Sequence, residues 1–358
     1  MTDRLNKLRS QLATKGLDAL LVSQAENRRY LSGFTGSAGF LLISQQKAIL
    51  ATDFRYVEQA QVQAPGFEVV QIQGDIAKWF PGLIAELQAR KLGFEGKSIS
   101  FSTYKELTDA INNIKIKISL IPTEGLVESL RAVKDKEELR LVEKAADLAD
   151  AALEYIIPRI KPGALEKEVA WEIESFLRQN GSESVPFELI VASGPNSAMP
   201  HARPTDRAIR QGEPVVIDIG ATVDGYTSDM TRTICLGNGD NMFNKVYDIV
   251  LGAQLTAMAT LQAGMTGEQA DRLARIVIEQ AGYKDAFGHG LGHGVGLATH
   301  EEPRLGKSSI DILAEGMVFT IEPGIYISGW GGVRIEDMIV LEEDKVRPLT
   351  KAKKVWRP

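Results

Sequence analysis

An internal repeat in the second part of the chain constrains the fold most. A helix is expected to end at Gly163 and the next at Gly181, strand-like sequence follows, and this order recurs about one hundred residues later. Three pairs of positions mark the repeat, at offsets of 101, 101 and 99 residues: Gly163 and Gly264, Gly181 and Gly282, and His201 and His300. Chance is the alternative, because glycine ends many helices. We favour duplication, which would create a cleft between two similar halves, a common place for a ligand.

The sequence predicts a smaller domain ahead of the repeat. Residues 1–131 contain no histidine and alternate short strand-like and helical stretches, with strands expected at 19–22, 39–43 and 47–51 and helices at 56–63 and 76–90. This mixture predicts a small α/β domain. After a charged stretch at 131–138, apolar residues recur at helical spacing. We predict an α+β protein with domains at 1–131 and 132–358.

Composition excludes several classes of protein. The chain has 358 residues, of which 44% are hydrophobic and 25% charged, as in ordinary soluble domains. Its single cysteine rules out an internal disulfide and fits a reducing compartment. The first residues are too charged for a secretory signal, and no apolar run approaches a membrane span. With a net charge of −6 and no basic block, we expect a cytoplasmic protein that binds neither nucleic acid nor membrane.

Two aspartates flank a predicted hairpin in the repeat region. An apolar run ends in Asp218, Asp224-Gly225 is a strong turn signal, and Asp229 follows. With the turn at those two residues, Asp218 lies opposite Thr231 and Asp229 is its diagonal neighbour, near enough to share metal ions. The alternative is that Asp218 only accepts hydrogen bonds from nearby backbone amides. A buried carboxylate is unfavourable unless it is paired or bound to metal.

All four histidines lie in the second part, and two of them stand in a glycine-rich segment, Gly288-His289-Gly-Leu-Gly-His293-Gly-Val-Gly296. Five glycines in nine residues oppose a helix. Alternation of glycine with side chains predicts an extended strand with one bare face. Four residues along a strand span about 13 Å, so we expect one histidine to be a ligand and the other to serve nearby. The alternative is a flexible loop with solvent-facing histidines.

Two further carboxylates, Glu322 and Glu336, stand in strand-like sequence on either side of a turn expected at 329–332. Alternation places Arg334 and Glu336 on one face, where the alternative role is a weak surface ion pair. Counting from the expected turn does not place Glu322 opposite Glu336.

Four carboxylates and one imidazole suit divalent ions such as manganese, cobalt or zinc. Five protein ligands exceed what one catalytic zinc uses, so two ions that share carboxylates are expected. Such a pair can lower the pKa of a bridging water and stabilise a tetrahedral intermediate. The sequence therefore predicts a dinuclear hydrolase.

These motifs resemble the pita-bread metallopeptidases, in particular their Xaa-Pro aminopeptidase and prolidase branch. The resemblance rests on the strings Ser193–His201, Gly292–Gly296, Thr299–Pro303 and Ile321–Gly324, and on the creatinase-like strings Asn27–Phe34 and Thr52–Tyr56. It implies a pita-bread domain after a creatinase-like domain, and a homodimer. It also implies five metal ligands: Asp218, Asp229, His293, Glu322 and Glu336.

The resemblance implies further roles. Glu322 would also be the general base, and His201 and His300 would stabilise the tetrahedral intermediate by hydrogen bonding. The substrate-side residues would be His289, Arg304, Tyr326 and Arg334. The implied reaction is attack of a metal-bridging water on the amide before proline, which releases the N-terminal residue of Xaa-Pro peptides. Manganese is the expected metal, with cobalt and zinc as alternatives.

Two other functions stay open. One is an Xaa-Pro dipeptidase, or prolidase, in which Arg304 would bind the proline carboxylate through paired hydrogen bonds. The N-terminal domain is also shorter than in the longer aminopeptidases. The other is a non-catalytic binding protein with the same fold, or a metal-free relative that hydrolyses creatine. Both of these lose metal ligands, whereas all five positions are filled here.

Overall fold

The computed structural model describes residues 2–112, 117–343 and 345–354. It divides into two compact units, Met1–Arg131 and Ala132–Pro358, and each unit is described by itself. No helix in the described ranges is long and apolar enough to cross a membrane.

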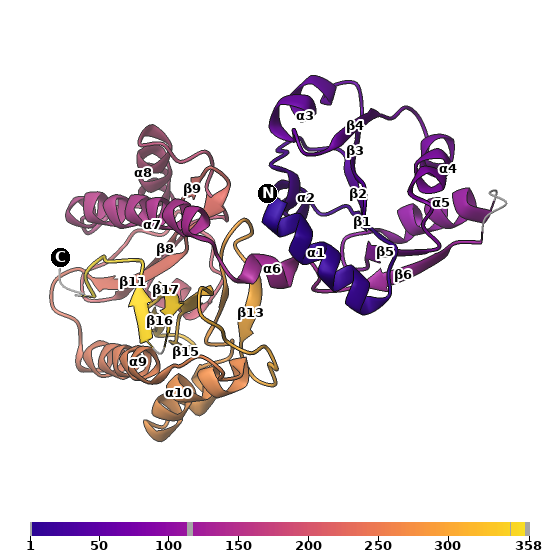
Figure 1. The fold of residues 1–358 in the computed structure, drawn as a ribbon. Coiled ribbons are helices and arrows are strands. Elements are labelled where there is room, and N and C mark those ends of the chain that lie inside the picture. Colours follow the sequence, from indigo (N-terminus) through magenta and orange to yellow (C-terminus); the bar gives the residue numbers. More distant parts are fainter. Residues whose placement is uncertain (1, 113–116, 344, 355–358) are drawn as a thin grey trace. The chain divides into compact units, whose positions relative to one another are not determined.

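The first unit is a six-stranded mixed sheet with helices on its faces. The strands run in the order β4-β3-β2-β1-β5-β6, with β1 antiparallel to β2 and parallel to β5. Its elements are α1 (Thr2–Lys15), β1 (Ala19–Val22), α2 (Ala25–Ser32), β2 (Phe40–Ser44), β3 (Ala48–Thr52), α3 (Val57–Gln63), β4 (Glu68–Gln71), α4 (Ile76–Leu87), β5 (Lys91–Glu95), α5 (Phe101–Asn112), β6 (Ser119–Thr123) and α6 (Glu128–Ala132). Phe80 of α4 and Leu107 of α5 pack with Leu21 and Leu42 into one core, so these two helices cover one face of the sheet (Figure 1). The predicted strands and helices are present, with ends that differ from the predicted ones by at most three residues.

The second unit begins with a helix pair and an antiparallel sheet. These elements are α7 (Lys136–Ile156), η1 (Ile157–Arg159), α8 (Glu166–Gln179), β7 (Ile190–Ser193), η2 (Gly194–Ala198), β8 (Pro214–Ile219), β9 (Thr222–Val223), β10 (Tyr226–Thr227) and β11 (Met230–Cys235). A capping box starts α7: the Asp135 carboxylate accepts from Glu138 N, and the Glu138 carboxylate accepts from Asp135 N. Strand β8 lies between β7 and β11, and all its residues are buried.

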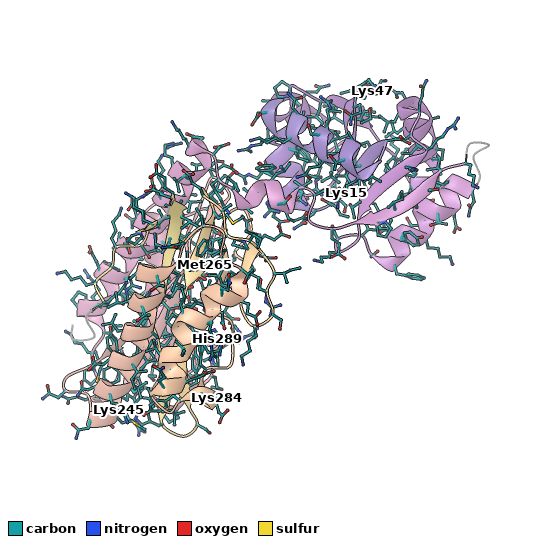
Figure 2. The ribbon with its side chains drawn as sticks, turned by 60° about the horizontal axis from the view of Figure 1, so that its bottom comes forward. Lys15, Lys47, Lys245, Met265, Lys284 and His289 are labelled. Carbon is teal, nitrogen blue, oxygen red and sulfur yellow. The ribbon has the colours of Figure 1, made fainter. Side chains whose placement is uncertain are left out.

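A second helix pair and sheet follow. They comprise α9 (Asn241–Thr260), α10 (Gly267–Gln280), η3 (Lys284–Ala286), β12 (Gly292–Gly294), β13 (Glu301–Leu305), β14 (Val318–Ile321), β15 (Gly324–Ile327), β16 (Gly331–Arg334), β17 (Asp337–Glu342) and β18 (Lys345–Pro348). Figure 1 shows α7 and α8 on one side of the strands and α9 and α10 on the other. Lys245, near the start of α9, and Lys284 in η3 both lie toward one end of this unit in Figure 2.

The two halves repeat their backbone hydrogen bonds, which confirms the duplication. Gly163 N donates to Ile209 O, and Gly264 N donates to Leu313 O in the second half. Likewise, isolated bridges join Leu165 to Ala208 and Thr266 to Ile312. The four glycines that mark the repeat all have positive φ, between 85° and 106°. Two helix pairs, each followed by an antiparallel sheet, are the predicted α+β architecture.

The glycine-rich segment differs from its prediction. Only Gly292–Gly294 forms a strand, whereas the whole segment from Gly288 to Gly296 was expected to be extended. The close backbone approach that the glycines predict is present at its centre, where a Cβ at Gly292 would lie 2.0 Å from Thr320 O. Ahead of the strand the backbone bonds to α10 instead of to a neighbouring strand, because Arg275 Nη2 donates to the His289 carbonyl (2.7 Å).

Candidate functional site

The hairpin between β8 and β11 places the first aspartate as predicted. Asp224 and Gly225 both have positive φ, 45° and 71°, as a two-residue type I′ turn requires. In the resulting register Asp218 lies opposite Thr231, which confirms the sequence prediction. Asp218 and Asp229 are both buried.

Three of the predicted ligands meet at one point. Asp229, His293 and Glu336 each offer an oxygen or nitrogen atom, and these atoms lie within 4.8 Å of one another. The His293 Nε2 atom is 3.6 Å from the Asp229 carboxylate. Asp229 comes from the first half of the second unit, whereas His293 and Glu336 come from the second half. The duplication therefore brings its two halves together at this cluster.

Glu322 joins the cluster from the end of β14. Its Oε1 atom is 3.4 Å from His293 Nε2 and accepts from Thr320 Oγ1 (3.2 Å). One register runs through both strand pairs, since Ile321 pairs with Asp337 and Gly324 with Arg334, so Glu322 and Glu336 lie across from each other. Hairpin counting missed this because Gly331 and Gly332 were assigned to the turn. They belong to β16, where a Cβ at Gly332 would lie 2.2 Å from Ser197 O.

Arg334 is a buried partner of the cluster, and the surface ion pair considered as an alternative is wrong. Its guanidinium is 2.6 Å from the Asp218 carboxylate and also donates to Thr231 Oγ1 (3.0 Å). Thr231 Oγ1 in turn donates to Glu336 Oε2 (2.6 Å). Sequence reasoning used Thr231 only as a register partner of Asp218. Its position across from a buried aspartate was the signal that it belongs to the site.

The charges of this cluster favour a bound cation. Burial, and then repulsion from neighbouring carboxylates, raise the pKa values of Asp229 and Glu336 well above their usual range. Burial also raises the pKa of Glu322. Asp218 Oδ1 is buried and has no hydrogen-bond partner among the described residues. A buried acceptor without a donor and several mutually repelling carboxylates fit divalent ions, which would satisfy the first and offset the second.

His289 lies beside the cluster and is absent from the close group. Its Nε2 atom is 2.9 Å from Tyr326 Oη, which accepts a hydrogen bond from Arg334 Nη1 (2.9 Å). Desolvation lowers the pKa of His289, and burial raises the pKa of Tyr326 to about 12. Both groups are therefore neutral near pH 7. Figure 2 shows His289 beside α10.

The remaining two histidines lie near the cluster. The rings of His300 and His293 have centroids 4.1 Å apart. Desolvation and the neighbouring His293 and His201 lower the pKa of His300 to about 4. His201 is exposed and follows Pro200, whose carbonyl accepts from Arg334 Nη1 (3.1 Å). The three predicted histidines His201, His289 and His300 thus lie outside the close group of Asp229, His293 and Glu336.

Arg304 lies on β13, directly across from His293 on β12. Residues paired across antiparallel strands project to the same face. Its side chain is exposed, and its guanidinium makes no hydrogen bond or ion pair with the described residues. Arg304 is therefore a cationic group on the His293 side of the sheet that is available to an anion.

The sequence matches two protein families. Residues 140–343 match metallopeptidase family M24, and residues 4–133 match the creatinase/prolidase N-terminal domain. The chain belongs to metallopeptidase family M24. It is 37% identical over 356 residues to a curated Xaa-Pro dipeptidase of Pyrococcus furiosus, covering 99% of both chains.

Solved structures of Xaa-Pro peptidases share the fold of this metallopeptidase. An Xaa-Pro dipeptidase from Bacillus anthracis is 44% identical, with a TM-score of 0.95 and coverage of 99% of this chain and 98% of that chain. An X-Pro aminopeptidase from Thermotoga maritima is 36% identical, with a TM-score of 0.87 and coverage of 96% and 98%. The creatinase-like and pita-bread domains predicted from the resemblance are confirmed.

Proposed function

We propose that this chain is a dinuclear-metal Xaa-Pro dipeptidase that hydrolyses the amide bond before a C-terminal proline. The observation that carries the proposal is Arg304, an unpaired guanidinium across from His293. A dipeptide presents its free carboxylate one residue beyond the bond that is cleaved. Arginine binds a carboxylate through two parallel hydrogen bonds, so Arg304 would select substrates that end at proline.

The proposed metal ligands are Asp218, Asp229, His293, Glu322 and Glu336. Their support is the shared burial of the aspartates and Glu336, the close group of Asp229, His293 and Glu336, and the unpartnered Asp218 Oδ1. Two divalent ions held there would supply an acidified water and a charge that stabilises the tetrahedral intermediate. Manganese is the proposed native metal, with cobalt and zinc as alternatives.

Glu322 is the proposed general base. It stands at the edge of the cluster and is less buried than Glu336, so its carboxylate can face both the other acids and an incoming substrate. Thr320 Oγ1 donates to Oε1 and thereby fixes the orientation of the carboxylate.

His300 and His201 are the proposed donors to the developing oxyanion. With a pKa of about 4, His300 is neutral near pH 7 and donates through an N–H without carrying charge. A positioned N–H contributes most where the oxyanion develops. His289, Tyr326 and Arg334 form a hydrogen-bonded chain beside Glu322, and we propose that this chain forms the substrate-side wall.

An Xaa-Pro aminopeptidase, the activity that the sequence resemblance implies, is the second candidate. The likeness to the Thermotoga maritima enzyme supports it. The exposure of Arg304 is compatible with longer substrates as well, because nothing among the described residues covers its guanidinium. The resemblance further supports a homodimer, which analytical ultracentrifugation would test.

The deciding experiment compares turnover of Xaa-Pro dipeptides with that of matched Xaa-Pro-Yaa tripeptides. Each is measured after chelation and after addition of Mn²⁺, Co²⁺ or Zn²⁺. We expect no activity without metal, and dipeptide cleavage that exceeds tripeptide cleavage by at least tenfold, or about 1.4 kcal/mol. Equal or faster tripeptide cleavage would favour the aminopeptidase. A protein that neither binds metal nor cleaves either substrate would revive the non-catalytic alternative.

A further inference from the structure

A buried arginine behind the carboxylate cluster holds the backbone on which Glu336 is mounted. Arg232 on β11 is 2% exposed, and its Nη1 atom donates to the carbonyls of Thr231 (2.9 Å) and Glu336. The backbone N–H of Glu336 donates to Thr231 O (3.0 Å). The peptide groups on both sides of the Glu336 side chain are therefore fixed to β11.

The counterion of Arg232 is Asp337, the residue next to Glu336. Arg232 Nη2 lies 2.6 Å from Asp337 Oδ1, and both side chains are almost fully buried. Asp337 also accepts from Gln254 Nε2 (3.1 Å) and Thr350 Oγ1 (2.8 Å), and it forms an ion pair with Lys354. Because strand residues alternate in direction, Asp337 points away from the cluster that Glu336 enters.

Residues 350–354, here called the terminal strap, complete the hydrogen-bond network around Arg232 and Asp337. Arg232 donates through Nε (3.1 Å) and Nη2 (2.8 Å) to the carbonyl of Ala352. The backbone N–H groups of Lys351 and Ala352 donate to the Asp150 carboxylate on α7, at 2.7 and 2.8 Å. Thr350 and Lys354 supply two of the four side-chain partners of Asp337. The strap thus connects α7 to the backbone beneath Glu336.

We propose that Arg232, Asp337 and the terminal strap are positioning groups that set the metal affinity of the cluster without touching the metal. This inference rests on the proposed assignment of Glu336 as a ligand. A carboxylate ligand binds best when its backbone is fixed before the ion arrives, and loss of such outer support lowers metal affinity by about 10- to 100-fold. The guanidinium of Arg232 bonds three carbonyls and a carboxylate at once, which an ammonium group on lysine cannot reproduce.

The test measures binding of Mn²⁺ alone to the full-length, metal-stripped protein, with free Mn²⁺ followed by electron paramagnetic resonance. The variants are Arg232→Lys, Asp337→Asn and Lys354→Met, with Arg207→Lys as the matched control. Arg207 also pairs with a carboxylate, that of Glu213 at 2.5 Å, but it does not contact Glu336 or Thr231. The Tm of each metal-free protein is recorded in parallel.

We expect Arg232→Lys and Asp337→Asn to raise the Kd for Mn²⁺ by about 10- to 100-fold. Arg207→Lys should lower Tm and leave Kd unchanged. Lys354 is partly exposed and supplies a single partner, so Lys354→Met should fold even where the other two do not, with a smaller rise in Kd. Unchanged Kd values in the folded variants, despite a lower Tm, would overturn the inference and leave Arg232 a purely stabilising residue.

Glu336→Gln separates this inference from the proposed function. If Glu336→Gln weakens Mn²⁺ binding and the Arg232 and Asp337 variants do not, only the positioning role fails. If wild type binds no stoichiometric Mn²⁺, or Glu336→Gln binds it as tightly as wild type, the proposed metal site fails and the positioning role falls with it.

Discussion

The two halves of the second unit share a backbone pattern but support their functional loops by opposite means. At the start of α8 the first half has Glu166, which is fully buried. Its carboxylate accepts from the backbone N–H of Ser193 (2.7 Å) and of Thr205 (3.1 Å). These two residues flank the segment that carries His201. A side chain thus fills the space between helix and loop in this half.

At the equivalent place, 101 residues later, the second half has Gly267. A Cβ there would lie 2.0 Å from Arg304 O, so the backbone of β13 packs directly against the start of α10. This close approach carries Arg304 to its position across from His293. The two halves therefore share their backbone hydrogen bonds but differ in what fills the space beside the helix. One half uses that space for a buried carboxylate, and the other uses it to bring in a strand.

The largest expected effect is the loss of catalysis when the proposed general base in the second half, Glu322, is replaced. Glu322→Gln keeps the shape of the side chain and removes its basicity, so we expect kcat on an Xaa-Pro substrate to fall by about 10²- to 10⁴-fold. The measurement is steady-state kinetics with Mn²⁺ restored. The control is Glu315→Gln, an exposed glutamate on the same half, which should match wild type. Activity retained by Glu322→Gln would move the base elsewhere.

Replacement of Glu166 tests the side-chain support of the first half. Glu166→Ala would leave the buried N–H and hydroxyl of Ser193 without their acceptor, at about 1–3 kcal/mol for each unsatisfied group. We expect the free energy of unfolding to fall by several kcal/mol in chemical denaturation. Gly267→Ala is its counterpart, and overpacking there should destabilise the protein by about 1–3 kcal/mol. A neutral result for Glu166→Ala would show that the carboxylate merely fills space.

The sequence predicted the elements of both halves but only part of the contacts between them. The type I′ turn at Asp224-Gly225 follows from local chemistry, since both residues tolerate positive φ. It fixed the position of Asp218 opposite Thr231 without further information. Local sequence patterns do not determine the structure at Gly331 and Gly332 in this way. Their glycine identity reflects contact with Ser197 of the first half, so they were mistaken for a turn and the pairing of Glu322 with Glu336 was missed.

The same limit explains Arg334 and His289. A strand pattern shows which residues share a face, but it does not show whether that face is covered. The strand pattern allows a surface role for Arg334, because it does not show that Asp218, from another strand pair, lies 2.6 Å away. The alternation of glycines in the His289 segment predicted close backbone approach, which is correct at Gly292, but it also predicted a strand over the whole segment, which is wrong outside Gly292–Gly294.

A substitution at Arg304 tests the function of β13, the strand whose backbone packs directly against Gly267. Arg304→Met keeps an apolar stem of similar length and removes the charge, so kcat/KM for an Xaa-Pro dipeptide should fall by about 10- to 100-fold, mainly through KM, as expected when a charged hydrogen bond to substrate is lost. Cleavage of an Xaa-Pro-Yaa tripeptide should change little. Arg304→Lys should restore part of the loss, because lysine keeps the charge without the paired geometry. Equal losses on both substrates would assign Arg304 to general substrate binding.

The smallest expected effect concerns the stability of the carboxylate cluster, to which both halves contribute acidic residues. Burial and mutual repulsion raise the pKa values of Asp229, from the first half, and Glu336, from the second. The folded, metal-free protein therefore binds more protons than the unfolded chain. Its stability must fall as pH rises from the ordinary carboxyl pKa of about 4 through the raised folded values. Buried histidines with lowered pKa values act in the opposite direction below about pH 6.5.

Comparison with Glu336→Gln isolates the carboxylates from the histidines, because both proteins contain the same imidazoles. After chelation the variant should gain stability relative to wild type as pH rises above the ordinary carboxyl pKa of about 4, because only wild type contains the Glu336 carboxyl, whose pKa the folded protein raises. A difference of about 1 kcal/mol corresponds to about 2–4 °C in a unit of this size, within the reach of calorimetry. With Mn²⁺ bound the order should reverse, because the ion binds the ionised carboxylate and stabilises wild type more. If the metal-free variant were more stable than wild type by the same amount at every pH, packing, and not repulsion between acids of the two halves, would set the stability of the carboxylate cluster.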